Sequence, residues 1–331
     1  MNREPMSETS SPLIETKNLK KYFKVRGGML HAVDDVSITI PARKTLGVVG
    51  ESGCGKSTLG RTVIRLIEPS SGEILFKGEP ILGFNKRRMR EARRKMQIIF
   101  QDPYSSINPR MSVAEIIAEF MLINKTCPNR MAAFERAAQL MDTVGLARRY
   151  ANVYPHELDG GRRQRIGIAR ALSLNPEFIV CDEPVSALDV SIQAQILNLL
   201  MDLQDDMGLT YMFITHSLSV VKHISDEIVV MYLGQCVEQA GSDELFINPL
   251  HPYTKALLSA IPEPDIEMRN KPIQVIRGEV TSPINPAPGC RFAARCDAAM
   301  DICSRETPPF SDQGGSHYAA CWKLKNGSGN V

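Results

Sequence analysis

The sequence predicts an α/β fold in which helices cover both faces of a mainly parallel β-sheet. Short apolar segments, typical of buried strands, alternate along the chain with longer segments of helical periodicity. A glycine-rich loop joins one such strand to one such helix, at the strand edge where open α/β sheets bind their ligands. With 331 residues, the chain is long enough for one large domain and a smaller appendage.

The N-terminal part contains the first strands and the first helix. Residues 1–12 are polar, and we predict that they are disordered. The segments 14–25 and 30–40 show the short alternation of strands, whereas residues 44–50 form an apolar strand of the buried type. Helical spacing follows at residues 56–67 and ends at a turn that contains proline and glycine.

A helical insertion is predicted in the middle of the chain. The next strand, at residues 95–100, ends at Gln101 and is followed by a loop. Two helical patterns come next, at residues 113–123 and 130–145, without a strand between them. We therefore expect a helical subdomain over about residues 102–165.

Strands and helices then alternate until the composition changes. The strands are predicted at residues 178–183, 210–215 and 227–232, and the helices at residues 192–208 and 218–225. Beyond about residue 262, proline becomes frequent and the periodicity fades. The predicted organisation is one large α/β domain over residues 13–247, followed by a small cysteine-containing extension over residues 248–331.

Charge and hydropathy exclude several classes of function. Lys and Arg number 39 against 37 Asp and Glu, and the net charge of +2 gives no basis for bulk binding of nucleic acid. No apolar stretch reaches the roughly 18 to 20 residues that a spanning helix needs, and the polar start lacks a signal-peptide segment. We expect a cytoplasmic chain whose eight cysteines are thiols or metal ligands.

A phosphate-binding loop follows the strand at residues 44–50. Residues 50–57, GESGCGKS, match the pattern G-x-x-x-x-G-K-[ST] directly before a helix. Glycines let backbone N–H groups surround a phosphate, and the helix N-terminus adds favourable partial charge. Lys56 is expected to reach the β- and γ-phosphates, and Ser57 to bind Mg²⁺. The nucleotide-binding residues predicted here are Gly50, Glu51, Ser52, Gly53, Cys54, Gly55, Lys56, Ser57 and Thr58.

Two acidic residues end a second apolar strand, in the sequence FIVCDE. Ligands of open α/β sheets lie at the carboxyl edge of the strands, so Asp182 is predicted to bind the same Mg²⁺. Glu183 is one residue further along and is predicted to polarise a water molecule near the γ-phosphate.

Three shorter motifs follow in order around these two. They are Gln101 in IIFQDP, the sequence SALD at residues 186–189, and His216 in FITHSL. With them, nearly the whole chain resembles the ATP-binding subunits of ABC transporters, in which two nucleotide-binding domains sandwich two ATP molecules. The resemblance implies a P-loop NTPase fold, with a RecA-like parallel core, an antiparallel β subdomain and a helical insertion.

The resemblance also implies roles for individual residues. Gln101 is expected to sense Mg²⁺ and the membrane subunits, and His216 to contact the γ-phosphate. Phe23, or Tyr22 beside it, is expected to stack on adenine. The catalytic residues are then Glu183, His216, Lys56 and Gln101, and the Mg²⁺ ligands are Ser57, Gln101 and Asp182. Guanine is not favoured, because residues 124–127 lack the Asp that a GTPase needs.

The signature sequence departs from the family pattern. In the family it reads Leu-Ser-Gly-Gly-Gln and contacts the γ-phosphate held by the opposite subunit, so Asp159, Gly160 and Gly161 are predicted nucleotide-binding residues. Asp159 replaces the Ser and Arg162 the Gln. A carboxylate about 4 Å from a phosphate oxygen costs on the order of 4 kcal/mol at an effective dielectric of 20, against about 1 kcal/mol for one lost hydrogen bond.

Two arrangements can offset this repulsion. Asp159 is a suitable helix N-cap, and Arg162, Arg163 and Arg165 can neutralise it or approach the phosphate themselves. Our hypothesis is that this signature forms the weaker of two ATP sites in a heterodimer. The alternative is a fully active homodimer in which Asp159 only caps a helix.

Four cysteines lie close together near the C-terminus: Cys290, Cys296, Cys303 and Cys321. Four thiols suffice for an iron–sulfur cluster or for zinc, although the paired C-x-x-C spacing of zinc ribbons is absent. These cysteines and NPLHPYTKALLSAIP at residues 248–262 resemble the tails of oligopeptide and dipeptide transporter ATPases, some of which hold a [4Fe-4S] cluster. Zinc and empty thiols remain alternatives.

The sequence therefore indicates the ATPase subunit of a peptide importer, bound peripherally to the cytoplasmic face of the inner membrane. The expected partners are a second ATPase subunit, two transmembrane permease subunits and an extracytoplasmic solute-binding protein. Nickel or oligosaccharide cargo remains open, because the binding protein selects it. The rivals are a soluble ABC ATPase of translation or DNA repair, and a redox sensor built on the cluster.

Overall fold

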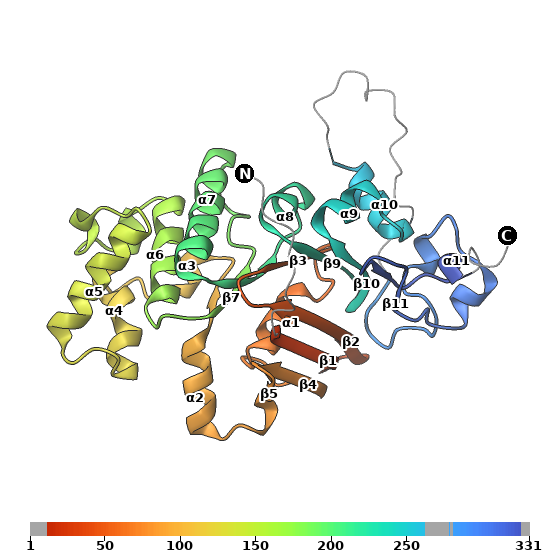
Figure 1. Ribbon diagram of the computed structural model, residues 1–331, viewed down its shortest axis with the longest axis horizontal. Helices are drawn as coiled ribbons and strands as arrows, with labels where there is room; N and C mark the ends of the chain where they lie inside the picture. The colour runs from red at the N-terminus through yellow and green to blue at the C-terminus, as the bar shows by residue number, and fades with distance from the viewer. Residues whose placement is uncertain (1–11, 262–277, 279–280, 326–331) are drawn as a thin grey trace, which may run out of the picture.

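The computed structural model describes residues 12–261, 278 and 281–325. Figure 1 shows an elongated molecule, with the helical insertion at one end, the β-sheets in the middle and the C-terminal extension at the other end. The disorder predicted for residues 1–12 falls outside the described ranges, except at Pro12, where the first strand begins.

A smaller, antiparallel sheet has the strand order β2-β1-β4-β5. The two long strands β1 (Pro12–Val25) and β2 (Gly28–Pro41) confirm the two strands predicted before the glycine-rich loop. The other two, β4 (Ser71–Phe76) and β5 (Glu79–Pro80), are not predicted by the sequence pattern. This sheet is the antiparallel β subdomain that the family resemblance implies.

The larger sheet has the strand order β11-β12-β10-β9-β3-β8-β7-β6. Its parallel strands are β3 (Thr45–Val49), β6 (Met96–Ile99), β7 (Phe178–Asp182), β8 (Thr210–Ile214) and β9 (Glu227–Tyr232). Its antiparallel strands are β10 (Gln235–Gly241), β11 (Ser311–Asp312) and β12 (Tyr318–Ala319). Because β3, β7 and β8 are parallel neighbours, the loops that follow them meet at one edge of the sheet.

Helices pack on both faces of the larger sheet, as predicted. Helix α1 (Lys56–Val63) lies between the two sheets, where it shares an apolar core with Val180 and Met212. Helix α7 (Val190–Met207) belongs to the core on the opposite face of the sheet. That core includes Ile179, the neighbour of Val180 in β7. Neighbouring strand residues therefore face opposite cores, which explains why the strands are apolar on both faces along most of their length. The helix α8 (Leu218–Ile224) packs on β3.

The helical insertion is confirmed as a set of helices that share one apolar core. Its helices are α3 (Pro103–Ser106), α4 (Val113–Asn124), α5 (Arg130–Thr143) and α6 (Gly160–Leu172), with the short 3₁₀ turns η2 (Arg148–Tyr150) and η3 (Pro155–Glu157). Ser112 and Glu115 form a capping box at the start of α4. The helix α2 (Lys86–Lys95) and the 3₁₀ turn η1 (Ile81–Gly83), which precede the insertion, are not predicted.

The C-terminal extension packs against the larger sheet. Helix α9 (Ser242–Ile247) follows β10 and ends the larger domain. The elements of the extension are α10 (Pro252–Ser259), η5 (Ala293–Arg295), η6 (Asp301–Ser304), β11, β12 and α11 (Trp322–Lys325). Strand β12 pairs with β10, so the extension continues the sheet (Figure 1). Glu238 of β10 is fully buried and accepts hydrogen bonds from the backbone of Leu250 and His251, and its Oε1 lies 2.8 Å from Nε2 of His317. Buried polar contacts thus anchor both halves of the extension to one strand.

Within the described ranges, every helix is too short or too polar to cross a lipid bilayer.

Candidate functional site

The loop between β3 and α1 contains three glycines with positive φ, of which Gly50 and Gly55 lie at its two ends. Gly50 has φ 151° and Gly55 has φ 104°. A Cβ atom at Gly55 would lie 1.9 Å from the carbonyl oxygen of Ala32, so only glycine lets the loop pass β2 this closely. Gly55 is also the N-cap of α1, and within the described chain no side chain caps it. The first N–H groups of α1 are therefore available to an anion.

Lys56 points into the concave side of this loop. Its ammonium group donates to the carbonyl oxygens of Gly50 at 2.8 Å and Glu51 at 2.9 Å, and the residue is buried. The Cys54 thiol, also buried, lies 3.7 Å from the same ammonium, and burial raises its pKa. The loop thus surrounds one positive charge, as an anion site requires.

Ser57 and Asp182 meet at the carboxyl edge of the sheet. The Ser57 hydroxyl donates to Oδ1 of Asp182 at 2.6 Å, and Nη2 of Arg61 lies 3.1 Å from Oδ2. Asp182 ends β7 and is fully buried, while Ser57 lies in the first turn of α1. A hydroxyl and a carboxylate side by side form the donor set that a hard cation such as Mg²⁺ prefers. The site therefore fits the predicted metal.

Glu183 is the centre of a second polar group. Its Oε2 accepts a hydrogen bond from Nε2 of Gln101 at 2.8 Å and lies 3.4 Å from Nδ1 of His216. Its φ of 49° is uncommon for a residue other than glycine. Three residues predicted from motifs far apart in the sequence therefore meet at one carboxylate.

A cavity of about 250 Å³ joins these groups to the antiparallel sheet. Its lining residues are Phe23, Leu30, His31, Ala32, Ser52, Gly53, Gly55, Lys56, Ser57, Thr58, Gln101, Glu183, Leu233, Gly234 and Pro283. Of the two aromatic candidates, Phe23 lines the cavity. Tyr22 instead stacks on His31 at 3.9 Å between ring centroids and donates a hydrogen bond to Asp34. The arrangement favours Phe23 for a stacked base.

The signature residues lie apart from this cavity. Among the described residues, those that line it do not include Asp159, Gly160 or Gly161, which begin α6 in the helical insertion. Asp159 is the N-cap of α6: its Oδ1 accepts from the backbone N–H of Arg162 at 2.8 Å, and Oδ2 lies 2.7 Å from that guanidinium. The helix cap and the neutralising arginine, which are the two arrangements considered from the sequence, are thus both present.

The other two arginines of the signature helix contact other groups. Arg163 donates to the carbonyl oxygen of Leu158 at 2.8 Å, and Arg165 donates to the carbonyl oxygen of Val144. Only Arg162, of the three predicted arginines, therefore offsets the charge of Asp159.

Several cavity residues were not predicted. His31 and Ala32 belong to β2, Leu233 and Gly234 to the turn between β9 and β10, and Pro283 to the C-terminal extension. Gly234 has a positive φ, and a Cβ atom there would lie 2.5 Å from the carbonyl oxygen of His31, so this position requires the glycine that the sequence shows. Pro283 has no such signal, because its position depends on long-range contacts.

The four C-terminal cysteines line one small cavity of about 20 Å³, together with His251 and Phe292. Their thiols are free, and burial raises the pKa of Cys290 to about 11 and, in the same direction, the pKa values of Cys296 and Cys321. Such a volume holds about one water molecule. In the described ranges, no three potential ligand side chains are grouped closely enough to hold a metal ion. The predicted iron–sulfur cluster is thus not supported by the placement of these side chains.

A second, larger cavity lies where α2 and β6 meet the helical insertion. It has a volume of about 1030 Å³ and an apolar floor that includes Phe100 and Phe120. Most of the charged side chains that line it are basic. The exposed ones, which form its rim, are Lys86, Arg87, Arg90 and Arg93, whereas Arg65 and Arg94 are half-buried, Arg170 is buried, and Glu68 is the acidic residue of the lining. Leu66 and Ile123, which are exposed by 49% and 55%, lie at its edge. An apolar groove with a basic rim is a surface suited to a partner.

Residues 33–186 match the ABC transporter family, and residues 237–303 match the C-terminal region of oligopeptide/dipeptide transporters. The oligopeptide transport ATP-binding protein OppF of Haemophilus influenzae is 51% identical over 309 residues, which cover 93% of this chain and 93% of that protein. The oligopeptide transport ATP-binding protein AppF of Bacillus subtilis is 49% identical over 321 residues, covering 93% and 96%.

Solved structures of ATP-binding cassettes have the same architecture. The dimeric structure of MJ0796, a bacterial ABC transporter cassette, has a TM-score of 0.64 and 27% identity, and covers 69% of this chain and 98% of its own. A post-hydrolysis dimer of MJ0796 bound to ADP and Pi has a TM-score of 0.64 and 26% identity, with the same coverage.

Proposed function

The chain belongs to the ABC transporter family, among the ATP-binding proteins of oligopeptide importers, and from this premise we propose how its site powers transport. The protein is an ATPase that binds ATP with Mg²⁺ and hydrolyses it to drive the import of peptides. The observation that carries this function is the meeting of Lys56, Ser57, Asp182 and Glu183 at one edge of the sheet.

In the proposed binding mode, the β3–α1 loop and Lys56 hold the triphosphate, and Phe23 stacks on the adenine. Ser57, Asp182 and Gln101 are the proposed ligands of Mg²⁺, which when bound neutralises charge on the phosphate oxygens. The support is the uncapped N-terminus of α1 and the contact of 2.6 Å between Ser57 and Asp182. The other proposed nucleotide contacts are the remaining loop residues: Gly50, Glu51, Ser52, Gly53, Cys54, Gly55 and Thr58.

Glu183 is the proposed base or orienting group for the attacking water. It is only partly exposed, at 14% of its side chain, and contacts both Gln101 and His216. His216 is 57% exposed and can turn toward the γ-phosphate without displacing packed side chains. Glu183 can therefore hold a water by hydrogen bonding while His216 and Lys56 stabilise the developing charge.

A second ATPase subunit completes each site in this proposal. Asp159, Gly160 and Gly161 begin α6 and face another chain's phosphate loop across the dimer. Asp159 already has its carboxylate charge partly offset by Arg162 at 2.7 Å, which lowers its repulsion of phosphate without removing it. We place this chain in a heterodimer, with its own phosphate loop in the stronger site and its signature in the weaker one.

The permease subunits bind the groove between α2 and the helical insertion. The basic rim favours an acidic permease segment, while Phe100 and Phe120 provide an apolar floor. Gln101 directly follows one of these floor residues and contacts Glu183 at 2.8 Å, so movement in the groove reaches the hydrolytic site through adjacent residues. This binding would place the chain peripherally at the cytoplasmic face of the inner membrane, with an extracytoplasmic solute-binding protein supplying the cargo.

The thiols near the C-terminus are the proposed ligands of a [4Fe-4S] cluster. The proposal rests on the four thiols of Cys290, Cys296, Cys303 and Cys321 and on their resemblance to the tails of related ATPases. The described arrangement does not group them closely enough for a metal ion, so a cluster requires the side chains to rearrange. Iron and acid-labile sulfide, measured on protein purified without oxygen, test this proposal. We expect both in the wild type and neither in Cys290→Ser, while Cys127→Ser in the helical insertion keeps them. Zinc, or no metal at all, in the wild type would overturn it.

Transport by the assembled complex tests the function itself. In proteoliposomes that contain the permease pair and both ATPase subunits, we expect ATP-dependent uptake of a labelled oligopeptide. Lys56→Ala should abolish uptake, whereas Arg305→Ala, on the exposed surface of the extension, should leave it unchanged. Uptake that persists in Lys56→Ala, or a chain that never assembles with the permease, contradicts the proposal.

A further inference from the structure

The C-terminal extension holds the phosphate loop at one residue, Glu51. The guanidinium of Arg295 donates to both carboxylate oxygens of Glu51, at 2.8 and 3.1 Å, and the hydroxyl of Tyr253 accepts the backbone N–H of Glu51 at 2.9 Å. The Arg295 side chain is 8% exposed and Tyr253 is fully buried. The hydrogen bond to Glu51 is the largest cause of a raised pKa at Arg295. Backbone and side chain of the loop are thus fixed from outside it.

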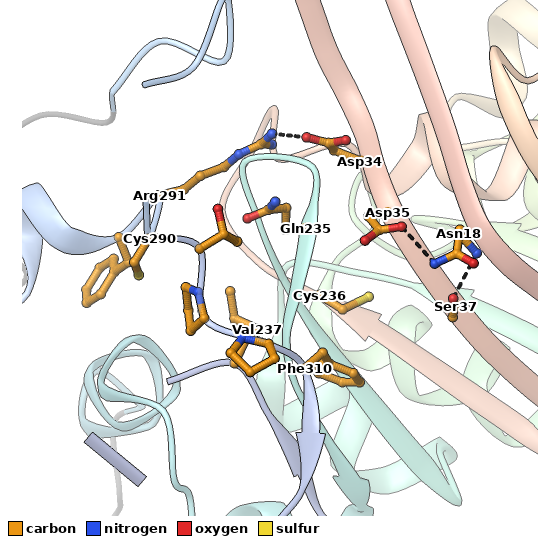
Figure 2. A pocket seen from close by; sticks show the side chains of 15 residues that line it. Asn18, Asp34, Asp35, Ser37, Gln235, Cys236, Val237, Cys290, Arg291 and Phe310 are labelled. Atoms are coloured by element: carbon orange, nitrogen blue, oxygen red, sulfur yellow. Dashed lines mark hydrogen bonds and ion pairs between the residues drawn. The ribbon is translucent and has the colours of Figure 1, made fainter. Parts of the chain in front are cut away.

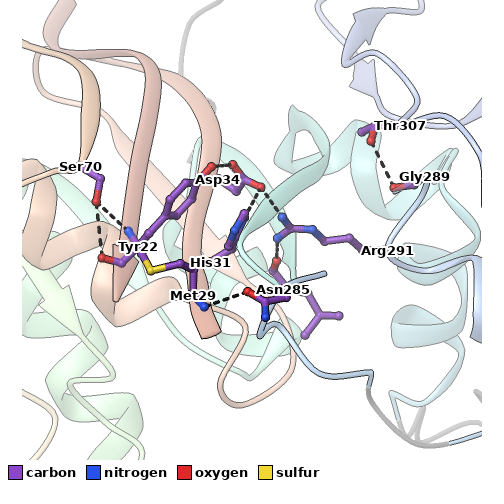
Figure 3. A network of polar contacts seen from close by, with 10 residues as sticks. Tyr22, Met29, His31, Asp34, Ser70, Asn285, Gly289, Arg291 and Thr307 are labelled. Carbon is purple, nitrogen blue, oxygen red and sulfur yellow. Dashed lines mark hydrogen bonds and ion pairs between the residues drawn. The ribbon is translucent and has the colours of Figure 1, made fainter. Parts of the chain in front are cut away.

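A second arginine of the extension holds the strand that borders the cavity. Arg291 pairs with Asp34 of β2 (Figure 2). It also donates to the carbonyl oxygen of Leu233. Asp34 also accepts from Tyr22 and lies 3.1 Å from Nδ1 of His31, which lines the nucleotide cavity (Figure 3). Burial alone would raise the pKa of Asp34, but these hydrogen bonds and the charge of Arg291 lower it. The carboxylate is therefore held ionised within the network.

The extension also reaches the end of the cavity where Phe23 lies. The carbonyl oxygen of Pro283 accepts the N–H of His31 at 3.0 Å, and Asn285 exchanges hydrogen bonds with Met29 at 2.9 Å in each direction (Figure 3). This short segment extends the edge of β2, and Pro283 itself lines the cavity. The extension therefore contacts the site at its phosphate end, along its side and at its other end.

We propose that the C-terminal extension is part of the nucleotide site, with Arg291 and Arg295 as positioning residues that set the affinity for ATP. The inference rests on the proposed function. It means that the extension forms the nucleotide cavity as a third structural unit, together with the two β-sheets. Each arginine is adjacent in sequence to a thiol of the cysteine cavity, Arg291 to Cys290 and Arg295 to Cys296. The segment 290–296 therefore links the two cavities.

The physical reason concerns both order and charge. A loop that must present N–H groups to a triphosphate binds best when it is already fixed in that shape. Removing Arg295 releases the loop and also leaves the Glu51 carboxylate uncompensated close to the phosphates, where it repels them. Removing Glu51 as well takes away the repulsion and leaves only the loss of order.

Equilibrium titration of the full-length chain with a fluorescent ATP analogue and Mg²⁺ tests this. We expect the Kd of Arg295→Ala to rise about tenfold, equivalent to about 1.4 kcal/mol, and that of Arg295→Lys to rise less. The double variant Arg295→Ala, Glu51→Ala should bind more tightly than Arg295→Ala alone. Arg305→Ala, an exposed arginine of the same extension, is the matched control and should bind as the wild type does.

A role limited to holding the extension in place would give a different result. It would lower the melting temperature of the nucleotide-free variants and leave the Kd and the KM for ATP within twofold of the wild type, which overturns the inference. A raised KM with kcat at saturating ATP largely kept supports it. Where Arg295→Ala fails to fold, Arg295→Lys gives the same comparison. If the wild type itself binds no Mg²⁺-ATP, the proposed function fails first.

Discussion

At the scale of single residues, Asp159 is placed where one carboxylate has two opposing effects. It stabilises α6 as an N-cap, a contribution of about 1 kcal/mol, and it brings negative charge to the helix that is proposed to meet a phosphate. Serine caps helices about as well as aspartate and carries no charge. Replacing Asp159 with serine therefore keeps the helix cap and removes the charge, which separates the two effects.

Asp159→Ser is expected to keep the fold and to raise ATP turnover of the assembled complex by up to about twofold, because the repulsion that Arg162 leaves uncompensated is removed from the weaker site. Turnover at saturating ATP is the measurement. The control is Asn129→Ser, which changes the N-cap of α5 in the same insertion. Unchanged turnover in Asp159→Ser would mean that the residue only caps its helix.

His251 gives a residue-scale prediction for pH. It is buried, and burial lowers its pKa from an ordinary 6.5 to about 3. Between about pH 3 and pH 6.5, the unfolded chain therefore binds a proton at His251 that the folded chain does not bind. The contribution of neutral His251 to stability is complete above about pH 6.5 and is lost as the pH drops toward 3. The slope is at most about 1.4 kcal/mol per pH unit.

We expect His251→Asn to flatten this part of the pH profile, since asparagine can still accept the N–H of Tyr253 that Nδ1 accepts at 3.1 Å. Urea unfolding at a series of pH values measures it. His223→Asn, an exposed histidine of α8, should keep the wild-type slope. Equal slopes in His251→Asn and the wild type would contradict the assignment.

At the scale of elements, α2 has the composition of a docking helix. Ten residues, KRRMREARRK, bury only Met89 and Ala92, and the remaining side chains are mostly basic. Such a helix gains little from its own core and has its charged face available to an acidic partner. Its position on the groove rim makes it the element most sensitive to charge reversal.

The double variant Arg87→Glu, Arg90→Glu should therefore weaken binding to the permease subunits by about tenfold or more, because repulsion replaces two attractive pairs at the rim. Co-purification with the permease at a series of salt concentrations measures it. ATP binding by the isolated chain should not change. Arg136→Glu on α5, outside the groove, should bind the permease normally. Normal binding by the double variant would place the permease elsewhere.

The same helix shows why some elements could not be predicted. The strands β3, β7, β8 and β9 are apolar except for one terminal residue each, because both faces are covered, and their pattern is strong enough to predict. Helix α2 lacks apolar periodicity, and β4 and β5 are short strands whose pairing depends on β1. The apolar pattern of a segment indicates which of its residues are buried. Elements that are stabilised mainly by partners distant in the sequence therefore leave little signal in that pattern.

Some residues of the candidate site could likewise be located from the sequence, and others could not. The phosphate loop, Asp182 and Glu183 could be located from the sequence, because glycine, lysine and acidic residues have fixed chemical tasks at fixed spacing. Pro283, Arg291 and Arg295 could not, since an arginine near the end of the chain has no local sign of its partner. Their contacts with β2 and the phosphate loop exist only once the extension has folded onto β10.

At the scale of the whole molecule, the extension and the helical insertion lie at opposite ends, with the nucleotide cavity between them (Figure 1). One end carries the groove proposed for the permease and the signature proposed for the second ATPase, and the other carries the thiols. The cavity touches residues of both ends, through Gln101 and through Pro283. Closure of an ATPase dimer would therefore act on a site that is supported from two sides.

Unequal sites in that dimer lead to a prediction for the complete transporter. If this chain's phosphate loop lies in the stronger site, Glu183→Gln in this chain alone should reduce ATP turnover to below about a tenth of the wild-type rate. The reason is that the carboxylate that orients water is lost where hydrolysis occurs, while the site that Asp159 completes contributes little. Turnover of the membrane-assembled complex at saturating ATP is the measurement.

The matched control is Gln193→Glu on α7, whose amide donates to the carbonyl oxygen of Leu188 at 2.9 Å and contacts no catalytic group in the described chain. It should leave turnover within twofold of the wild type. Survival of about half the turnover in Glu183→Gln would instead mean that two equal sites hydrolyse ATP independently. In that case Asp159 does not reduce hydrolysis at the site that the signature completes. The weaker-site hypothesis is then wrong, and the dimer has two equally active sites.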